Sequence, residues 1–215
     1  MRIGILGTGN MADALGRQWA RAGHEVFVGG RDAGRAAELA ARIGGAGSGG
    51  LAAAVESGTD AVLLAVPYAA AVEVVSGLEV ALRGRVLIDC SNAVGPGFVL
   101  ATRSGRSAAG EIAAAAPGAH VVKAFNLCHE DVWRLTPPVF GGRPLAVPVA
   151  GDSAEALAVV RRLVRDLGCE PLNAGGLDRA GLIEATAALL IGLWVGEGAD
   201  AQAIAPPLDF AQPVS

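Results

Sequence analysis

Hydrophobic and polar positions follow two alternating patterns along the chain. Short runs of consecutive apolar residues, typical of strands buried on both faces of a parallel sheet, lie at 2–6, 25–28, 61–66, 85–89, 121–124, 145–150 and 170–173. Between them, helical periodicity or apolar content predicts helices at 10–22, 32–43, 51–56, 68–82, 104–116, 152–167 and 178–194. Strands that alternate with helices indicate βαβ units. We therefore predict an α/β fold with a doubly wound, mostly parallel sheet.

Several residues predict where these helices begin and end. Gly23 and Gly168 directly follow helical patterns and are expected to terminate them. Asp32 is expected to cap the second helix, because its carboxylate can accept from the first-turn amides. Asp152 and Glu155 have the spacing of a capping box before the helix at 152–167.

The connecting segments divide the chain into two parts. A Pro-interrupted loop at 135–144 separates a domain at 1–144 from a small C-terminal α/β lobe at 145–215. Residues 44–50 are expected to be flexible, and residues 199–215 irregular. The lobe is too short for a large independent substrate domain. A substrate is therefore expected at the carboxyl edge of the sheet, roofed by the C-terminal segment or by a second subunit.

Composition excludes several classes of protein. The chain has 215 residues, of which 17 are basic and 21 acidic, and only 4% are aromatic, so we expect no nucleic-acid partner. The apolar stretches at 61–72 and 182–195 are interrupted by Pro67 and Glu184, and we expect no membrane span. The chain opens on a strand-like run, so no signal peptide is expected.

Cysteine spacing adds a compartment. The three cysteines form no CxxC pair and are far apart in sequence, which argues against a disulfide scaffold and suits the reducing cytoplasm (Cys90, Cys128 and Cys169). No metal-ligand spacing occurs, and we expect no metal site.

A glycine-rich turn follows the first predicted strand. It fits the pattern G-x-G-x-x-A, with the sequence Gly7-Thr8-Gly9-Asn10-Met11-Ala12. Gly7 permits the tight turn, Gly9 lets the backbone approach a pyrophosphate, and Ala12 keeps the helix close to the sheet. The alternative is a tight turn that merely requires small residues. The strand before the turn and the helix after it favour a dinucleotide-binding Rossmann domain.

The end of the second strand favours NADP(H) over NAD(H). An NAD-binding protein usually has an acidic residue there, which binds the ribose 2′-hydroxyl. Here Gly30 and Arg31 occupy that position, and Arg35 follows one helical turn later. Guanidinium groups bind a 2′-phosphate through planar, paired hydrogen bonds. The acidic Asp32 is explained as a helix cap, and the alternative for Arg31 is an ordinary surface arginine.

Residues at the carboxyl ends of later strands face the crevice where such sheets bind ligands. Pro67, after Val66, can shape a wall beneath a nicotinamide ring. Asn92 and Asn126 can bind its amide or ribose, or they can satisfy their own turns.

Two residues are candidates for proton transfer. Lys123 is the single lysine beside sixteen arginines, so it is either a required point charge or an edge lysine that extends to solvent. His129 is either a proton donor or a surface histidine. Cys128 fits a small buried residue better than a nucleophile.

Taken together, these motifs resemble the NADPH:F420 oxidoreductase family. The likeness covers nearly the whole chain in order, at Gly7–Met11, 22–26, Gly30-Arg31, Val66-Pro67, 123–126, 149–152 and 173–177 with Ile183-Glu184. The resemblance implies a Rossmann domain with a small lobe, usually dimeric, that carries hydride between NADP(H) and the deazaflavin coenzyme F420. The residues it implies are Thr8, Arg31 and Arg35 at the 2′-phosphate, Val66 and Pro67 at the nicotinamide, and Ala124 to Leu127 at the acceptor.

The chain departs from the family pattern at several positions. Gly30 stands where a serine is usual, and Leu127 where many bacterial relatives have threonine. The remaining departures are Ser91-Asn92-Ala93, in place of Thr-Asn-Pro, and Cys128-His129. Apart from Gly30, these changes concentrate around the acceptor.

Three functions follow from this reading. The first is a cytoplasmic, homodimeric, NADPH-dependent oxidoreductase with F420 as its small-molecule hydride acceptor. The second is an imine or ketone reductase of a biosynthetic pathway, which would need a proton donor such as Tyr68, Lys123 or His129. The third is a regulatory protein that binds NADPH without catalysis.

Overall fold

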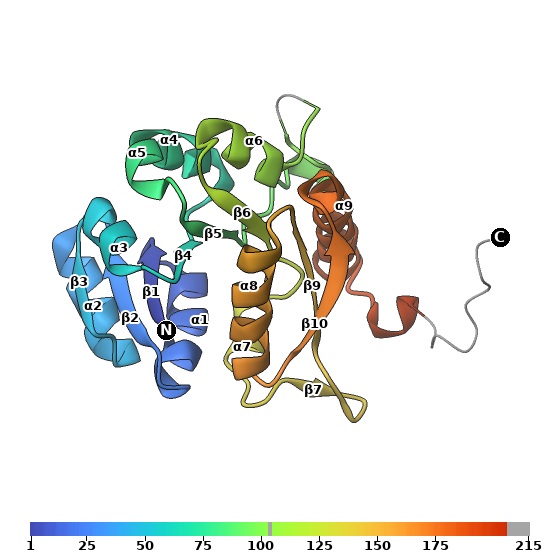
Figure 1. Cartoon of the computed structure of the whole chain (residues 1–215). Coiled ribbons are helices and arrows are strands. Elements are labelled where there is room, and N and C mark those ends of the chain that lie inside the picture. Colours follow the sequence, from blue (N-terminus) through green and yellow to red (C-terminus); the bar gives the residue numbers. More distant parts are fainter. Residues whose placement is uncertain (103–104, 206–215) are drawn as a thin grey trace.

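Eight strands form one sheet in the order β10-β9-β6-β5-β4-β1-β2-β3 in the computed structural model, which describes residues 1–102 and 105–205 (Figure 1). The strands are β1 (Arg2–Leu6), β2 (Glu25–Gly29), β3 (Gly47–Gly49), β4 (Ala61–Leu64), β5 (Val86–Asp89), β6 (His120–Lys123), β9 (Ala146–Gly151) and β10 (Glu170–Gly175). Strands β1 to β6 run parallel. Strand β9 pairs antiparallel with β6 and parallel with β10. This confirms the predicted doubly wound, mostly parallel α/β sheet.

The order of the strands reverses between β1 and β4. From β1 the chain builds outward through β2 and β3, then crosses to β4 and builds the other way. The loops that follow β1 and β4 therefore diverge at their carboxyl ends, and this switch point is where open α/β sheets bind ligands.

Helices cover both faces of the sheet. They are α1 (Asn10–Arg21), α2 (Ala33–Ile43), α3 (Leu51–Ser57), α4 (Tyr68–Gly77), α5 (Glu79–Leu82), α6 (Ala108–Ala115), α7 (Glu130–Trp133), α8 (Ala154–Asp166) and α9 (Ala180–Ile191). Helices α1, α2, α7 and α8 contribute to one buried cluster, and α3 to α6 contribute to the other. The two clusters sandwich the sheet between apolar layers.

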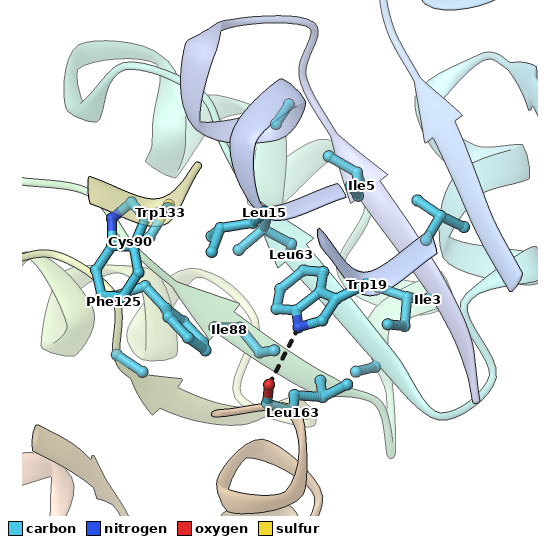
Figure 2. Packing of buried hydrophobic residues seen from close by; sticks show 14 of the residues in the cluster. Ile3, Ile5, Leu15, Trp19, Leu63, Ile88, Cys90, Phe125, Trp133 and Leu163 are labelled. Carbon is cyan, nitrogen blue, oxygen red and sulfur yellow. Dashed lines mark hydrogen bonds between the residues drawn. The ribbon is translucent and has the colours of Figure 1, made fainter. Parts of the chain in front are cut away.

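Three aromatic rings organise the first cluster. Phe125 lies between Trp19 and Trp133, with edge-to-face contacts and centroid distances of 5.7 and 5.5 Å. The indole Nε1 of Trp19 donates to the Leu163 carbonyl at 3.3 Å (Figure 2). These contacts join α1, the loop after β6, α7 and α8, so they fix the position of the loop that follows β6.

Most predicted elements are confirmed, with four local differences. Residues 44–50 contain the short edge strand β3, and the helix expected at 68–82 divides at Leu78. The loop at 135–144 contains a hairpin of β7 (Val139–Phe140) and β8 (Arg143–Pro144), and the short helix α7 precedes it. The helix expected at 104–116 starts at Ala108, after a Ser107 cap, and residue 104 lies outside the described residues.

The helix caps are as expected except one. Asp32 accepts from the Arg35 amide at 3.0 Å, and Gly23 and Gly168 have positive φ at the ends of α1 and α8. The predicted capping box at Asp152 is wrong, because Ser153 caps α8 and accepts from the Ala156 amide. The Asp152 carboxylate instead accepts from the Leu177 amide at 2.8 Å, and so joins the start of α8 to the start of the last helical segment.

The last helical segment is longer than the sequence indicated. A 3-10 turn and a π-helical turn extend α9 to the range Leu177–Gly196. By length and composition alone this segment could cross a membrane, and 28% of its most apolar 18-residue stretch is buried. A core helix can have the same composition. Glu184, near its middle, is buried in an ion pair with Lys123.

The division at residue 144 stays a prediction. Strand β9 of the C-terminal lobe pairs directly with β6, so both parts share one sheet. The predicted irregular end contains a short 3-10 turn at Gln202–Ile204. Residues 206–215 of that segment lie outside the described residues.

The contact between β1 and α3 gives a stability prediction. A Cβ on Gly4 would lie 2.0 Å from the Ala54 carbonyl oxygen, so Gly4→Ala forces two backbones apart. We expect it to lower the free energy of unfolding by about 1–3 kcal/mol or more, measured by urea denaturation. The control is Gly77→Ala, whose Cβ would meet no atom within 4 Å and which should be neutral or stabilising. Equal stability of Gly4→Ala and wild type would contradict this packing.

Candidate active site

The glycine turn between β1 and α1 has the geometry of a dinucleotide-binding loop. Gly7 has φ +126°, and a Cβ there would lie 2.3 Å from the Ala65 carbonyl oxygen. A Cβ on Gly9, at the start of α1, would meet no atom within 4 Å, and α1 has no side-chain cap. Space is therefore open in front of the helix N-terminus, where an anionic group is stabilised by the first-turn amides.

A cavity of about 1010 Å³ opens in front of this turn. Its walls come from the loops at the carboxyl ends of β1, β4, β5 and β6, and its roof from the end of α9 and the segment after it. The main lining residues are 9–11, 65–68, 90–92 and 125–130 in the walls and Ile191, Trp194, Val195, Asp200 and Gln202 in the roof. The lining is mainly apolar. It lies at the switch point of the sheet, where we expected the substrate.

The structure brings eight of the predicted site residues to the cavity. They are Gly9, Asn10, Met11, Val66, Pro67, Asn92, Asn126 and His129. Gly7, Thr8, Arg31, Arg35, Lys123 and Ala124 do not line it. The roles predicted for both groups stay predictions.

The residues predicted for the 2′-phosphate follow two adjacent strands, Thr8 after β1 and Arg31 and Arg35 after β2. Arg31 and Arg35 are exposed, and neither guanidinium forms an ion pair within the described part of the chain. A Cβ on Gly30 would lie 3.0 Å from Thr8 Cγ2, so the glycine brings Thr8 close to this corner. Within residues 1–102 and 105–205, both guanidiniums are therefore without an ion-pair partner.

Asn92 and Asn126 form a reciprocal pair. Asn92 Nδ2 donates to the Asn126 carbonyl at 2.7 Å, and Asn126 Nδ2 donates to Asn92 Oδ1 at 2.9 Å. Asn126 Oδ1 and the Ser91 hydroxyl are buried and have no hydrogen-bond partner among the described residues. Buried polar atoms are rarely unpaired. Both residues line the cavity, but these two atoms are enclosed by neighbouring protein atoms.

Lys123 lies behind this wall and is fully buried. Its Nζ donates to Asp89 Oδ2 at 2.8 Å and to the Ser91 carbonyl at 2.6 Å, and it lies 3.0 Å from Glu184 Oε1. Burial lowers its pKa, but the two carboxylates outweigh burial and the pKa is raised. The alternative that Lys123 extends to solvent is therefore wrong.

His129 lies at the rim of the cavity and caps α7. Its side chain is 67% exposed, its Nδ1 accepts from the Asp131 amide at 3.3 Å, and its Nε2 lies 3.2 Å from a Glu130 oxygen. Glu130 in turn accepts from Asn10 Nδ2 at 2.7 Å. The polar groups at this end thus join the glycine turn to α7.

The cysteines behave as apolar residues. Burial raises the pKa of Cys128 to about 11 and that of Cys90 to about 12, so their thiolates are scarce at neutral pH. Cys128 is partly buried and lines the cavity, so it is not the fully buried residue expected, but it packs against the apolar core and its raised pKa agrees with a packing residue rather than a nucleophile. Within residues 1–102 and 105–205, no group of three or more His, Cys, Asp or Glu side chains could hold a metal ion.

Sequence reasoning included Phe125 in the acceptor range 124–127 but not its backbone conformation, and it missed Trp194 and Val195 as cavity residues. Phe125 adopts φ +63°, which is rare for a bulky residue, and its ring fills the aromatic cluster beneath the cavity. Trp194 and Val195 form part of the roof, although the sequence shows them only as members of an apolar helix. The sole available signal was an aromatic residue in a helix that is apolar on nearly all sides.

Comparison with known proteins agrees with this geometry. Residues 2–93 match the family described as NADP oxidoreductase, coenzyme F420-dependent. The F420-dependent NADP reductase of Methanothermobacter thermautotrophicus is 30% identical over 210 residues, which cover 90% of this chain and 89% of that protein. The metalloreductase STEAP3 of Rattus norvegicus is also 30% identical, over 194 residues and 90% of this chain, but the chain spans only 38% of its length.

Solved structures share the fold. A proposed F420-dependent NADP reductase from Arthrobacter sp. FB24 superposes with a TM-score of 0.79 at 24% identity, covering 93% of this chain and 96% of that one. An imine reductase from Pseudomonas sp. gives a TM-score of 0.66 at 18% identity, covering 90% of this chain and 62% of that one. At these identities the likeness concerns the fold alone.

The family match and the F420-dependent NADP reductase relative show the class of protein, an NADP-dependent oxidoreductase, and the Rossmann sheet and glycine turn agree with it. Within that class, the chain belongs to the family of coenzyme F420-dependent NADP oxidoreductases. The expected resemblance, the fold class and the enzyme class are thereby confirmed.

The raised thiol pKa values give a reactivity prediction. In the folded protein at pH 8, iodoacetamide should alkylate Cys128 about 100-fold and Cys90 about 1000-fold more slowly than in the protein unfolded in urea, because the folded thiols are almost wholly protonated. Peptide mass spectrometry over time measures both rates. Equal rates for Cys128 in the two states would show a reactive thiol at the cavity and would contradict its assignment as a packing residue.

Proposed function

We propose that this protein transfers a hydride between NADP(H) and the deazaflavin coenzyme F420. The observation that carries the proposal is the large, mainly apolar cavity that runs from the N-terminus of α1 to the segment after α9. Such a space suits two stacked rings. The F420-dependent NADP reductases to which the chain is similar support the same reaction.

NADP(H) supplies the hydride, and the chain's task at that end is to bind and orient it. The first-turn amides of α1, open beyond Gly9, would bind the pyrophosphate. Thr8, Arg31 and Arg35 would bind the 2′-phosphate, because both guanidiniums are exposed and unpaired within the described ranges. Asn10 and Met11 would line the path between these two ends.

The nicotinamide would lie against the loops after β4, β5 and β6. Val66 and Pro67 would support one face of the ring, and Asn92 and Asn126 would bind its carboxamide. Asn126 Oδ1 and the Ser91 hydroxyl, which have no partner within the described ranges, are enclosed in the same wall and would reach the carboxamide after a small shift of that wall. This is the fit expected if the buried polar atoms are satisfied only when the ligand is bound.

The acceptor would occupy the space between the loop after β6 and the roof. Ala124 lies behind this loop, and the segment 125–128 faces the cavity opposite Ile191 and Trp194. Apolar walls exclude water and hold donor and acceptor carbons at contact distance, which is most of what hydride transfer requires. One proton is added to the acceptor together with the hydride, and His129, at the rim, is its proposed donor.

An assay with NADPH and oxidised F420 tests the proposal. We expect rapid loss of the visible deazaflavin absorbance with NADPH and little with NADH. Arg31→Ala should raise KM for NADPH about 10- to 100-fold, because a charged hydrogen bond contributes about 1.5–3 kcal/mol. KM for NADH should hardly change. The matched control is Arg21→Ala, an exposed arginine in the last turn of α1, which should leave both values unaltered.

Failure to reduce F420 while NADPH still binds would overturn this proposal. It would favour the imine or ketone reductase, for which Tyr68 is placed in the cavity wall with its hydroxyl donating to Glu111 at 2.7 Å. Tight NADPH binding without oxidation by any carbonyl, imine or deazaflavin would favour a regulatory protein.

We further propose that the protein is a cytoplasmic homodimer. The three free cysteines suit a reducing compartment. Exposed apolar side chains lie on α9, on the π-helical turn after it and on the loop before α6. They are Leu182, Leu189, Val195, Val99 and Leu100. A second copy would cover this face and would seal the roof of the cavity.

The dimer proposal predicts a change of mass in solution. Wild type should have twice the chain mass by light scattering after gel filtration, and Leu182→Glu with Leu189→Glu should be monomeric, because two charges cannot be buried unpaired. The control is Val80→Glu, an exposed apolar residue on α5. A monomeric wild type at micromolar concentration would refute the proposal.

A further inference from the structure

Three charged side chains form a buried cluster behind the cavity wall. Lys123 and Asp89 are fully buried and Glu184 is 1% exposed. The Lys123 Nζ lies 2.8 Å from Asp89 Oδ2 and 3.0 Å from Glu184 Oε1. None of the three lines the cavity. Buried charges are costly unless they are paired, so this arrangement demands an explanation beyond stability alone.

The cluster holds one cavity wall by its backbone. Asp89 and Lys123 are the last residues of the adjacent strands β5 and β6 and lie opposite each other in the parallel register. Asp89 Oδ1 accepts from the Ser91 amide at 2.8 Å, and Lys123 donates to the Ser91 carbonyl at 2.6 Å. Both backbone polar groups of Ser91 are therefore fixed. Ser91 and the next residue, Asn92, line the cavity.

The cluster also holds the roof helix. Glu184 of α9 accepts from the Ala108 amide at 2.8 Å and from the Ala109 amide at 3.1 Å, so it also binds the N-terminus of α6. Ile191 follows Glu184 by seven residues, or about two helical turns, and lies on the same side of α9. Ile191 lines the cavity from above. Glu184 thus fixes the angle at which α9 approaches the opposite wall.

The geometry explains why a lysine stands here in a chain that otherwise uses arginine. An ammonium has three donors around one atom, and three acceptors surround it: Asp89, Ser91 and Glu184. A planar guanidinium is larger and directs its donors in a fixed fork, so it would not match this set. The α6 amides stabilise the second carboxylate, since one ammonium faces two acids.

On the basis of the proposed function, we infer that Asp89, Lys123 and Glu184 are positioning residues that set the separation between the nicotinamide wall and the roof. Lys123 acts through the Ser91 backbone and through α9, not by giving a proton. Without the cluster, the wall at Ser91 and the helix at Ile191 would move independently. Hydride transfer would then slow while NADPH binding, which depends mainly on the glycine turn and Arg31, would persist.

The test uses Lys123→Met, Lys123→Arg and Glu184→Gln. Stopped-flow absorbance with saturating NADPH and F420 gives the hydride-transfer rate, and quenching of protein fluorescence gives the affinity for NADPH. We expect each variant to slow transfer by about 100-fold, the effect of misplacement by about 1 Å. The Kd for NADPH should change less than about threefold, far less than the expected change in the transfer rate. Lys123→Arg should not restore the rate although it keeps the charge.

A second readout does not depend on turnover. Hydrogen–deuterium exchange should rise together at Ser91-Asn92 and along Thr186 to Ile191 in all three variants, because the same charged cluster protects both segments. The control is Asp166→Asn, which breaks the ion pair of Asp166 with His24, remote from the cavity. It should leave both the transfer rate and these two segments unchanged.

The outcomes separate this inference from the proposed function. Wild type that fails to reduce F420 would overturn the proposed function. The exchange pattern would still show whether the charged cluster holds the Ser91-Asn92 wall and the roof helix together. Wild-type transfer rates in folded Lys123→Met, or exchange that rises at only one of the two segments, would overturn the inference. If Lys123→Met does not fold, Glu184→Gln, which preserves shape, decides by the same two measurements.

Discussion

The close approach of backbones around β1 is the constraint on which the rest of the structure depends. At Gly7 a side chain would strike the carbonyl oxygen of Ala65, and at Gly4 it would strike that of Ala54. Because neither residue has a side chain, β1 lies tightly against β4 and α3, and the chain turns directly into α1. The crevice at the switch point opens between the loops that follow β1 and β4, which diverge with no side chain at Gly7 between them.

The cavity lining is mainly apolar, with Glu130 and Asp200 as its acidic members, and two further clusters of paired charges lie outside it. Burial would raise the pKa of Asp13, but hydrogen bonds from Arg134, Arg42 and Arg17 outweigh it and the pKa is lowered, so this cluster ties α1 to α2 and α7 at the surface. Lys123 is compensated in the same way beneath the wall. The cavity is left mainly apolar, which fits chemistry that occurs between two bound rings, with the protein supplying position.

Local chemistry accounts for what the sequence predicted well. A buried parallel strand needs consecutive apolar residues, a tight turn needs glycine, and a helix start is favoured by a capping side chain. The strands, the Gly7–Gly9 turn and the Asp32 cap could therefore be predicted from the sequence. The capping box at Asp152 failed for a tertiary reason. Its carboxylate is used by Leu177, a residue distant in sequence, while the neighbouring Ser153 serves α8.

The sequence by itself determined the class of fold, the position of the glycine turn and the strand ends that face the crevice, because each depends on spacing within a few residues. Only the tertiary structure decided the burial and the partners of Lys123, since Asp89 comes from β5 and Glu184 from α9. It also decided that Ile191 and Trp194 form the roof. Contacts between distant segments follow from how elements pack, and pairing of buried charges is a three-dimensional condition that no local pattern records.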